Sequence, residues 1–391
     1  MQQLLPADDF NCNFALKIKT VTTFKALGLH KNLVQGITEM GIETPTEIQE
    51  KAIPFLLTKG TDFIGQAQTG TGKTAAFGLP ILQKIDVTDN ATQALVLCPT
   101  RELGQQIAKQ FFKYTKYTEK IFTEAVYGGE KIDKQIAALS RTTHIVVATP
   151  GRLLDLMKRK VVNLDKVKTI VLDEADEMLS IGFKMELDEI LSRIGERKNI
   201  WLFSATMSEG IQKIIKKYMK PDAQRVEISR GKIVNEQISH NYVISEASMK
   251  LQTLLSFLQS QRGERGIVFC KTKAATQTLE KQLKSRNVEV AVIHGDLMQK
   301  EREKAMRAFI NEKANVLVAT DISARGIDVS NLAFVVHYQL PDQIEYYTHR
   351  SGRTGRGGKS GMSLCIIEPS ELQRIKKIGA ELNIHFKRIA D

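Results

Sequence analysis

Short apolar runs alternate along the chain with longer amphipathic segments of helical length, and these runs fall into two series. The first series predicts strands at 62–65, 94–98, 122–126, 144–148, 169–173 and 200–204, and the second at 266–270, 289–293, 315–319, 334–337 and 363–367. An alternation of strand and helix is typical of parallel sheets covered by helices. The pattern therefore predicts an α/β fold with two structurally similar halves.

The stretch between the two series, 227–246, has no sustained helical period and contains Ser229-Arg230-Gly231-Lys232. Such a stretch favours a linker. We predict a first domain at 22–228, a flexible linker at 229–245 and a second domain at 246–391, which agrees with a length of 391 residues. Residues 1–21 show no clear periodicity and are expected to form an N-terminal extension, either disordered or lying along the first domain.

The composition, with 42% apolar and 26% charged residues, is that of a soluble globular protein. No stretch approaches the roughly 18 apolar residues of a membrane span, and the N-terminus lacks the pattern of a secretory signal. We therefore expect a cytoplasmic protein without a membrane segment. Its cysteines are too far apart for a disulfide framework or a zinc site to be expected. They are Cys12, Cys98, Cys270 and Cys365.

The chain is basic, with 56 Lys and Arg against 44 Asp and Glu and a formal net charge of +12. A polyanion such as nucleic acid is one partner that this charge suits. Simple solubility is the other explanation, and charge alone leaves both open.

A glycine-bearing loop with the residues of a phosphate cradle follows the first predicted strand. Its sequence is Gln68-Thr69-Gly70-Thr71-Gly72-Lys73-Thr74, and a predicted helix begins there. Glycines let the backbone N–H groups approach phosphate oxygens, Lys73 suits the β and γ phosphates, and the Thr74 hydroxyl suits Mg²⁺. Ala67 departs from the usual pattern, since it stands at the first glycine position.

Two carboxylates end the apolar run 169–173 and complete the predicted nucleotide site. Asp173 is expected to hold Mg²⁺ together with Thr74, and Glu174 is the candidate general base for the attacking water. Asp176 is expected to have a structural or coupling role instead. The loop and the acids together predict hydrolysis of a nucleoside triphosphate.

The segment Asp173-Glu174-Ala175-Asp176 and further motifs between about Phe24 and Ile367 resemble those of the DEAD-box ATP-dependent RNA helicases. The resemblance implies two RecA-like domains, each a parallel sheet flanked by helices, and it implies ATP and Mg²⁺ as cofactors. It also implies RNA-stimulated ATP hydrolysis coupled to domain closure and to local, non-processive unwinding of RNA or remodelling of RNA–protein complexes.

The segment from Gly41 to Gln49 resembles the family's Q motif, in which the glutamine amide reads adenine. The resemblance assigns Phe24, Thr44 and Gln49 to nucleotide binding, and it places Asp328 at the ribose. Ile42 stands where the family commonly has an aromatic residue.

The segment His349-Arg350-Ser351-Gly352-Arg353-Thr354-Gly355-Arg356 resembles the family's arginine-finger motif. A guanidinium can stabilise charge on the transferred phosphoryl group, which gives Arg353 and Arg356 a catalytic role. Read without the resemblance, the same segment also suits a basic nucleic-acid loop. The residues expected to couple hydrolysis to unwinding are Asp176, Ser204, Thr206 and His349.

The residues that resemble the family's RNA contacts follow predicted strands in both halves, at the edge where open α/β sheets bind ligands. In the first half they are Thr100, Arg101, Gly128, Gly129, Thr149, Pro150, Gly151 and Arg152, and in the second Lys271, Thr272, Gly295, Gln299, Arg302 and Thr320. Hydroxyls, backbone N–H groups and guanidinium suit phosphate and sugar, so sequence-tolerant and salt-sensitive binding is expected.

Two alternatives to an RNA helicase follow from the same residues: an ATP-dependent RNA clamp with little unwinding, and a DNA-directed translocase. Glu174 and Arg356 favour turnover over a clamp, and Gln49 and Asp176 favour RNA over DNA. We expect a monomer whose partners are single-stranded or short duplex RNA and protein regulators.

Overall fold

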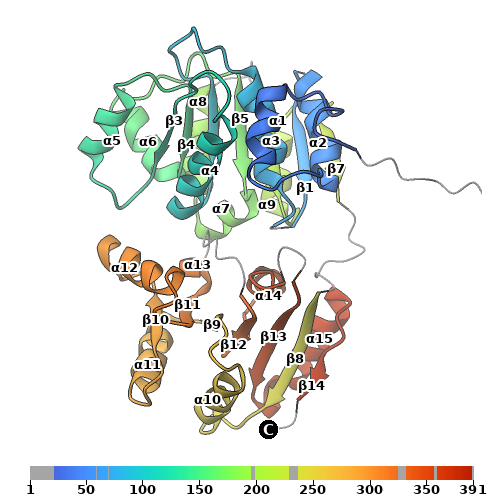
Figure 1. Cartoon of the computed structure of the whole chain (residues 1–391), viewed down its shortest axis with the longest axis vertical. Helices are drawn as coiled ribbons and strands as arrows, with labels where there is room; N and C mark the ends of the chain where they lie inside the picture. The colour runs from blue at the N-terminus through green and yellow to red at the C-terminus, as the bar shows by residue number, and fades with distance from the viewer. Residues whose placement is uncertain are drawn as a thin grey trace, which may run out of the picture.

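The computed structural model describes residues 22–389, with the exception of 59, 69, 195–198, 229–236, 325–331 and 356–358. Within these residues the chain forms two sheets of seven strands each. Every pairing between neighbouring strands is parallel. Figure 1 shows the two units one above the other, and the two-domain α/β prediction is confirmed.

The first sheet has the strand order β3-β4-β2-β5-β6-β1-β7. Its strands are β1 (Phe63–Gln66), β2 (Ala94–Leu97), β3 (Thr123–Val126), β4 (Ile145–Ala148), β5 (Thr169–Asp173), β6 (Asn199–Ser204) and β7 (Gln224–Glu227). The helices of this domain are α1 (Lys31–Thr38), α2 (Glu47–Thr58), α3 (Lys73–Lys84), α4 (Arg101–Tyr114), α5 (Ile132–Leu139), α6 (Pro150–Lys158), α7 (Ala175–Ile181), α8 (Lys184–Ile194) and α9 (Glu209–Tyr218).

The second sheet has the strand order β10-β11-β9-β12-β13-β8-β14. Its strands are β8 (Ile238–Ile244), β9 (Gly266–Cys270), β10 (Val290–Ile293), β11 (Val316–Thr320), β12 (Phe334–His337), β13 (Gly361–Ile367) and β14 (Lys387–Arg388). The helices are α10 (Lys250–Ser260), α11 (Lys273–Lys284), α12 (Gln299–Ile310), α13 (Asp321–Ala324), α14 (Ile344–Ser351), α15 (Leu372–Leu382) and a short 3₁₀ helix, Pro369–Glu371.

Each strand predicted from the sequence is present, and three further strands, β7, β8 and β14, were not predicted. The predicted linker at 229–245 is wrong over its second part, because Ile238–Ile244 pairs with β13 from Gly361 to Ile367. The strand was not predicted because the polar residues His240 and Asn241 interrupt its apolar sequence. Both residues are nevertheless buried. Residues 229–236 of the predicted linker, and the predicted extension 1–21, lie outside the described residues.

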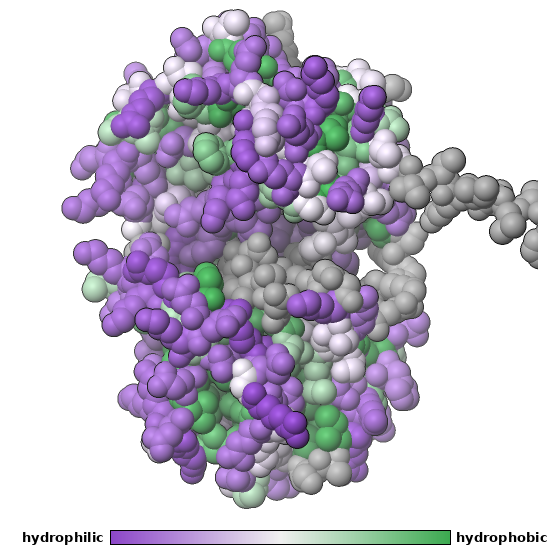
Figure 2. Space-filling view, in the orientation of Figure 1, coloured by the Kyte–Doolittle hydropathy of each residue, from purple (hydrophilic) through white to green (hydrophobic). Residues whose placement is uncertain are grey.

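The central strands of the first sheet are buried on both faces, which explains why they have continuous apolar sequences. Along β2, Leu95 and Leu97 pack into one cluster with residues of α6, α8 and α9, whereas Val96 packs into another with residues of α1, α2, α3 and α4. This alternation is the pleat of a strand covered on both sides. Hydrophilic residues dominate the face of the molecule that Figure 2 shows. None of the helices in the described part of the chain is long and apolar enough to cross a bilayer.

The carboxyl ends of the strands of both sheets point towards the region where the domains meet. In Figure 1, α7, which follows β5, lies at the lower side of the first domain, and α13 and α14, which follow β11 and β12, lie at the upper side of the second. Loops at the carboxyl ends of parallel strands are where open α/β sheets bind ligands. The predicted site residues that directly follow these strands therefore lie on the sides of the two domains that face each other.

Asp62, directly before β1, is buried and joins three parts of the first domain. Its Oδ1 accepts a hydrogen bond from the Ile200 backbone N–H at 2.7 Å, and its Oδ2 accepts one from the Lys220 N–H at 2.6 Å. Burial raises the pKa of Asp62, although these two hydrogen bonds oppose the shift. The carboxylate thereby ties the start of β1 to β6 and to the turn after α9.

We predict that Asp62→Ala lowers the free energy of unfolding of the first domain by about 3 kcal/mol, because it leaves two N–H donors without a partner in a buried site. Urea unfolding of the full chain, followed by circular dichroism, measures this. Asp222→Ala, at an exposed position of the same turn, is the control and should change stability little. A loss below about 1 kcal/mol for Asp62→Ala would show that water satisfies both donors.

Candidate functional site

The loop between β1 and α3 has the backbone of a phosphate cradle. Gly70 and Gly72 have φ values of +81° and +89°, a conformation that glycine adopts without strain. A Cβ atom on Gly72 would lie 2.3 Å from Nε2 of Gln49, so a side chain at this position would displace the Gln49 carboxamide. The Thr71 hydroxyl donates to the Gln68 carbonyl at 2.8 Å and closes the turn. Thr69 lies outside the described residues.

Lys73 is the first residue of α3 and is only 6% exposed. Its ammonium donates to the Ala67 carbonyl at 2.9 Å. The Lys73 side chain therefore lies over the loop that is expected to bind phosphate. Thr74, the next residue, is half-buried. The cradle thus presents a cation and a hydroxyl at the start of a helix, where backbone N–H groups favour an anion.

Gln49 lies in helix α2, and its side chain binds the phosphate-cradle loop. Its carboxamide donates to the Gly72 carbonyl at 3.0 Å and accepts from the Thr46 N–H at 2.9 Å. Thr46 was not predicted, yet its hydroxyl donates to the Thr71 carbonyl at 2.7 Å. Because a carboxamide has two N–H groups and two lone pairs, one donor and one acceptor of Gln49 remain for a base.

The other two residues assigned to nucleotide binding by the Q motif have different surroundings. Phe24 is 2% exposed and packs in the hydrophobic core beneath α1 and α2, while Thr44 is exposed. Ile42 is partly buried against the same core. Phe24 is therefore held by the fold rather than presented on the surface.

The acidic residues lie at the junction of β5 and α7. Asp173 is 2% exposed, and its Oδ1 has no hydrogen-bond partner. Burial raises the pKa of Asp173 to about 7, against the opposing charge of Lys73. Glu174 caps α7 with φ +51° and ψ +51°, a left-handed conformation that costs a non-glycine residue energy and is typical of functional sites.

Mg²⁺ suits this arrangement. A buried carboxylate oxygen without a partner is costly unless something else satisfies it. The Asp173 carboxylate and the Thr74 hydroxyl are the hard oxygen ligands that Mg²⁺ takes, together with water and phosphate oxygens. The residues present therefore fit the ion that the sequence predicts.

The predicted coupling residues of the first domain contact one another. Oδ2 of Asp176 accepts from the backbone N–H of Thr206 at 2.8 Å and from its hydroxyl at 3.0 Å. The Ser204 hydroxyl donates to the Thr206 carbonyl at 2.7 Å, so Ser204 reaches Asp176 only through Thr206. The loop after β6 is thereby fixed to the first turn of α7.

Helix α7 also contacts α14 of the second domain. Nδ1 of His349 pairs with Oε1 of Glu177, and the hydroxyls of Ser180 and Tyr346 are 2.5 Å apart. Burial by itself lowers the pKa of His349, but the hydrogen bond with Glu177 and the carboxylates around it raise the pKa overall. The charged, ion-paired form of His349 is therefore favoured here. Sequence reasoning had missed Glu177, although it follows Asp176 directly.

The arginines around α14 differ in their surroundings. Arg350 is 1% exposed and donates to both oxygens of Asp321, at 2.5 and 2.7 Å, and to the Gln339 carbonyl at 2.7 Å. It holds α14 to the loops after β11 and β12. Arg353, just beyond the helix, is half-buried, and Arg356 and Asp328 lie outside the described residues.

Two predicted RNA contacts from different domains converge on one carboxylate. Oε1 of Glu102 accepts from Nε of Arg101 at 2.7 Å and from Nε of Arg302 at 2.8 Å. Arg302 also donates to the Ser323 carbonyl at 2.8 Å, and burial lowers its pKa although Glu102 opposes the shift. Glu102 is a second functional candidate that sequence reasoning missed, and its position directly after Arg101 was the available signal.

The other predicted RNA contacts of the first domain surround Arg101. A Cβ atom on Gly129, whose φ is +88°, would lie 3.0 Å from the Arg101 guanidinium, and Gly128 beside it is exposed. Arg152 donates to the Gln135 side chain at 2.7 Å and to the Glu130 carbonyl at 3.1 Å. Three further predicted residues mark the start of α6: Thr149, its N-cap, followed by Pro150 and Gly151.

Helix starts position the predicted RNA contacts at the ends of β2 and β9. The hydroxyl oxygen of Thr100 accepts from the Leu103 N–H at 3.3 Å, and that of Thr272 accepts from the Ala275 N–H at 3.1 Å. Both threonines are N-caps, a position that this residue type favours.

The remaining predicted contacts lie on the second domain. Lys271 pairs with Asp342 at 2.7 Å, and Thr320 is buried with its hydroxyl 2.9 Å from that of Ser323. Gly295 is exposed, and Gln299 begins α12, although its side chain is not among the described ones.

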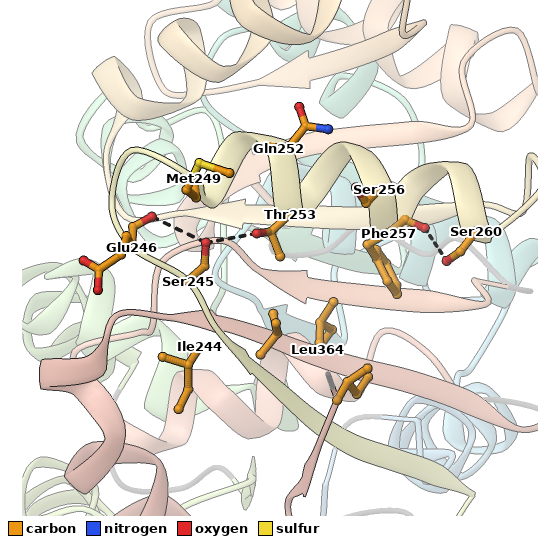
Figure 3. Close-up of a pocket in the computed structure, with 12 residues that line it drawn as sticks. Ile244, Ser245, Glu246, Met249, Gln252, Thr253, Ser256, Phe257, Ser260 and Leu364 are labelled. Carbon is orange, nitrogen blue, oxygen red and sulfur yellow. Dashed lines mark hydrogen bonds between the residues drawn. The ribbon is translucent and has the colours of Figure 1, made fainter. Parts of the chain in front are cut away.

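A separate cavity of about 610 Å³ lies in the second domain between α10 and the strands β8 and β13 (Figure 3). Val243, Met249, Phe257 and Leu364 are among its lining residues. Ser245 and Thr253, also in its wall, share a hydrogen bond of 2.9 Å. None of the predicted site residues lines this cavity, so the candidate site is the interface between the domains.

Two family descriptions match the chain: DEAD/DEAH box helicase over residues 46–214, and Helicase conserved C-terminal domain over residues 249–358. The DEAD-box ATP-dependent RNA helicase CshA of Bacillus cereus is 41% identical over 358 residues, which are 92% of this chain and 68% of the relative. The ATP-dependent RNA helicase CshA of Listeria monocytogenes is 43% identical over 90% of this chain and 67% of its own length.

The solved structure of Saccharomyces cerevisiae Dbp5 bound to RNA and ADP BeF3 has a similar fold, with a TM-score of 0.87 and 32% sequence identity. The alignment covers 94% of this chain and 95% of that one. Since its motifs, its two sheets and its relatives agree, the chain belongs to the family of DEAD-box ATP-dependent RNA helicases.

Proposed function

We propose that this chain closes its two domains over ATP and a short stretch of RNA, and that closure and hydrolysis drive local, non-processive separation of RNA strands. The observation that carries the proposal is the pair of contacts between α7 and α14, His349 with Glu177 and Ser180 with Tyr346. They join the helix that follows the acidic residues to the helix that leads to the arginines. We take residues 22–228 as the first domain and begin the second at Ile238.

The first domain supplies the phosphate cradle and the base. Lys73, now donating to the Ala67 carbonyl, exchanges that partner for phosphate oxygens. Thr74 and Asp173 would hold Mg²⁺, which neutralises phosphate charge when it is bound. Glu174 orients the attacking water and accepts its proton, a role for which its constrained backbone position suits it.

The second domain supplies positive charge to the transferred phosphoryl group. Arg353 and Arg356 follow α14, whose position is fixed by the buried pairing of Arg350 with Asp321. A guanidinium held in this way stabilises charge that develops in the transition state. Asp328 is assigned to the ribose.

RNA binds across both domains through its backbone. A phosphate that approaches Arg101 and Arg302 competes with Glu102 for the same guanidinium groups. Because these two arginines belong to different domains, RNA is bound best when the domains are together. We assign the coupling of RNA binding to hydrolysis to Asp176, Thr206, Ser204 and His349. Their contacts fix the loop after β6 to α7 and join α7 to α14.

We propose further that the protein acts as a monomer in the cytoplasm, where protein regulators bind outside the ATP and RNA sites. The relatives compared above are named as RNA helicases, which supports an RNA helicase over an RNA clamp or a DNA translocase.

Lys73→Ala and Glu174→Gln should each lower the kcat of RNA-stimulated ATP hydrolysis by about 100-fold or more, since one removes the phosphate cation and the other the base. Glu174→Gln keeps the shape of the side chain and should still bind ATP. A coupled ATPase assay and binding of a fluorescent ATP analogue measure the two effects. Glu209→Gln, at an exposed position of α9, is the control. Turnover at the wild-type rate in either variant rejects the site.

The adenine assignment of Gln49 predicts that GTP supports hydrolysis at less than about one tenth of the ATP rate. Gln49→Ala should raise the KM for ATP about tenfold and weaken this discrimination, because the amide that reads the base is lost. Initial rates with each nucleotide test this. Gln83→Ala is the control, since its carboxamide binds the backbone of residues 28 and 30 at the far end of α3. Equal rates with GTP and ATP in the wild type would exclude adenine reading by Gln49.

A further inference from the structure

The outer face of helix α4 carries an exposed aromatic residue, Phe112. Its inner face, which includes Leu103, Ile107, Phe111 and Tyr114, is buried in the core of the first domain. On the opposite face Phe112 is 77% exposed, although Phe111 beside it already fills the core position. A phenylalanine this exposed buries little of its ring in the core. Its environment therefore points to a ligand.

Two lysines beside Phe112 carry positive charge that is not paired with a carboxylate in the described part of the chain. Lys109 and Lys113 are exposed, at spacings of three and one residues from Phe112, and neither has an ion-pair partner among the residues that the structure describes. Lys116, one turn further on, differs because it pairs with Glu39. We call Lys109, Phe112 and Lys113 the α4 stripe.

The α4 stripe continues the predicted RNA surface. Arg101 begins α4, and residues 101, 105, 109, 112 and 116 follow one line along the helix, because steps of three and four residues stay on one face. Between the two ends, Gln105 donates to the Tyr127 hydroxyl at 2.5 Å, and Tyr127 directly precedes the exposed Gly128. The line from Arg101 to Phe112 is about 17 Å long at 1.5 Å per residue.

In Figure 1, α4 lies with α1 and α3 on the side of the first domain that faces the viewer, and along this line Gln105, Lys109 and Phe112 are exposed. Figure 2 shows the same side, where hydrophilic residues predominate. A strand that leaves Arg101 along α4 therefore meets a surface and not a core.

We propose that the α4 stripe binds single-stranded RNA that extends beyond the site between the domains. Phe112 offers a ring on which a base stacks, and Lys109 and Lys113 on either side of it neutralise phosphates. The line is long enough for about five stacked nucleotides at roughly 3.4 Å each. This inference rests on the proposed RNA-binding function, and it adds a second RNA-binding surface that does not depend on the RNA sequence.

A nucleic acid explains the α4 stripe better than a protein partner does, for two reasons. Its free charges are both positive, which complements a polyanion. It is also continuous, through Gln105 and Tyr127, with the end of α4 that carries Thr100 and Arg101.

The test is a series of labelled single-stranded RNAs of increasing length, bound to the full chain in the presence of a non-hydrolysable ATP analogue and followed by fluorescence anisotropy. In the wild type, the affinity for RNA should rise by about fivefold or more once the RNA is several nucleotides longer than the site between the domains can hold. In the triple variant Lys109→Gln, Phe112→Ser, Lys113→Gln this gain should vanish. Affinity for the shortest RNA and the ATPase rate that it stimulates should remain within twofold of wild type.

Two further variants separate stacking from charge. Phe112→Trp should keep the gain, because an indole also stacks, whereas Phe112→Ser alone should lose most of it. Lys216→Gln with Lys220→Gln removes the same charge at exposed positions in and after α9, on the other side of the sheet, and should leave the gain intact. The dependence of affinity on salt should weaken only in the stripe variants that lose lysines.

Two results would overturn the inference while leaving the proposed function in place: a wild type that binds long and short RNA equally well, or a triple variant that retains the full gain. The second result would make the α4 stripe a protein-docking face or plain surface. A wild type that binds no RNA of any length would instead reject the proposed function itself, and the inference with it.

Discussion

The contact between α7 and α14 is the interaction on which the account of this protein depends. Helix α7 begins directly after Asp173 and Glu174, and α14 ends just before Arg353. In the proposed mechanism each domain alone therefore has only part of the chemistry: one has the phosphate cradle and the base, the other the arginines. The pairing of His349 with Glu177 and the hydrogen bond between Ser180 and Tyr346 bring the two parts together. Because both contacts are polar and few, closure has to be stabilised further by whatever binds between the domains.

Several basic residues that are predicted to contact RNA form ion pairs with carboxylates of the protein at the interface between the domains. Glu102 binds Arg101 and Arg302, and Lys271 binds Asp342, so these three predicted phosphate contacts are neutralised by carboxylates of the protein. Replacing a carboxylate with a phosphate exchanges one charge-assisted hydrogen bond for another, which keeps the cost of binding low. Arg350 is different, since it is almost completely buried with Asp321 and serves to position α14.

The sequence predicted most of this fold because the central strands of both sheets are buried on two faces and so have continuous apolar sequences. It missed β7, β8 and β14, which lie at or next to the end of a sheet and are short or polar. The motif residues around Lys73, Asp173 and Thr206 could be predicted because the chemistry proposed for them requires particular residue types at particular spacings. Glu177, Glu102 and Thr46 were not found, because their roles come from contacts with residues far away in the sequence.

Single-molecule energy transfer between the domains tests the central claim most directly. Dyes attached at Lys158→Cys and Lys284→Cys, both exposed, with Cys12 replaced by serine, report the distance between the first and second domains. With RNA and a non-hydrolysable ATP analogue, we expect a closed population in the wild type and about a fivefold smaller one in His349→Ala, with ATP binding to the first domain retained. A closed population of the same size in His349→Ala would contradict the claim that the contact between α7 and α14 completes the site.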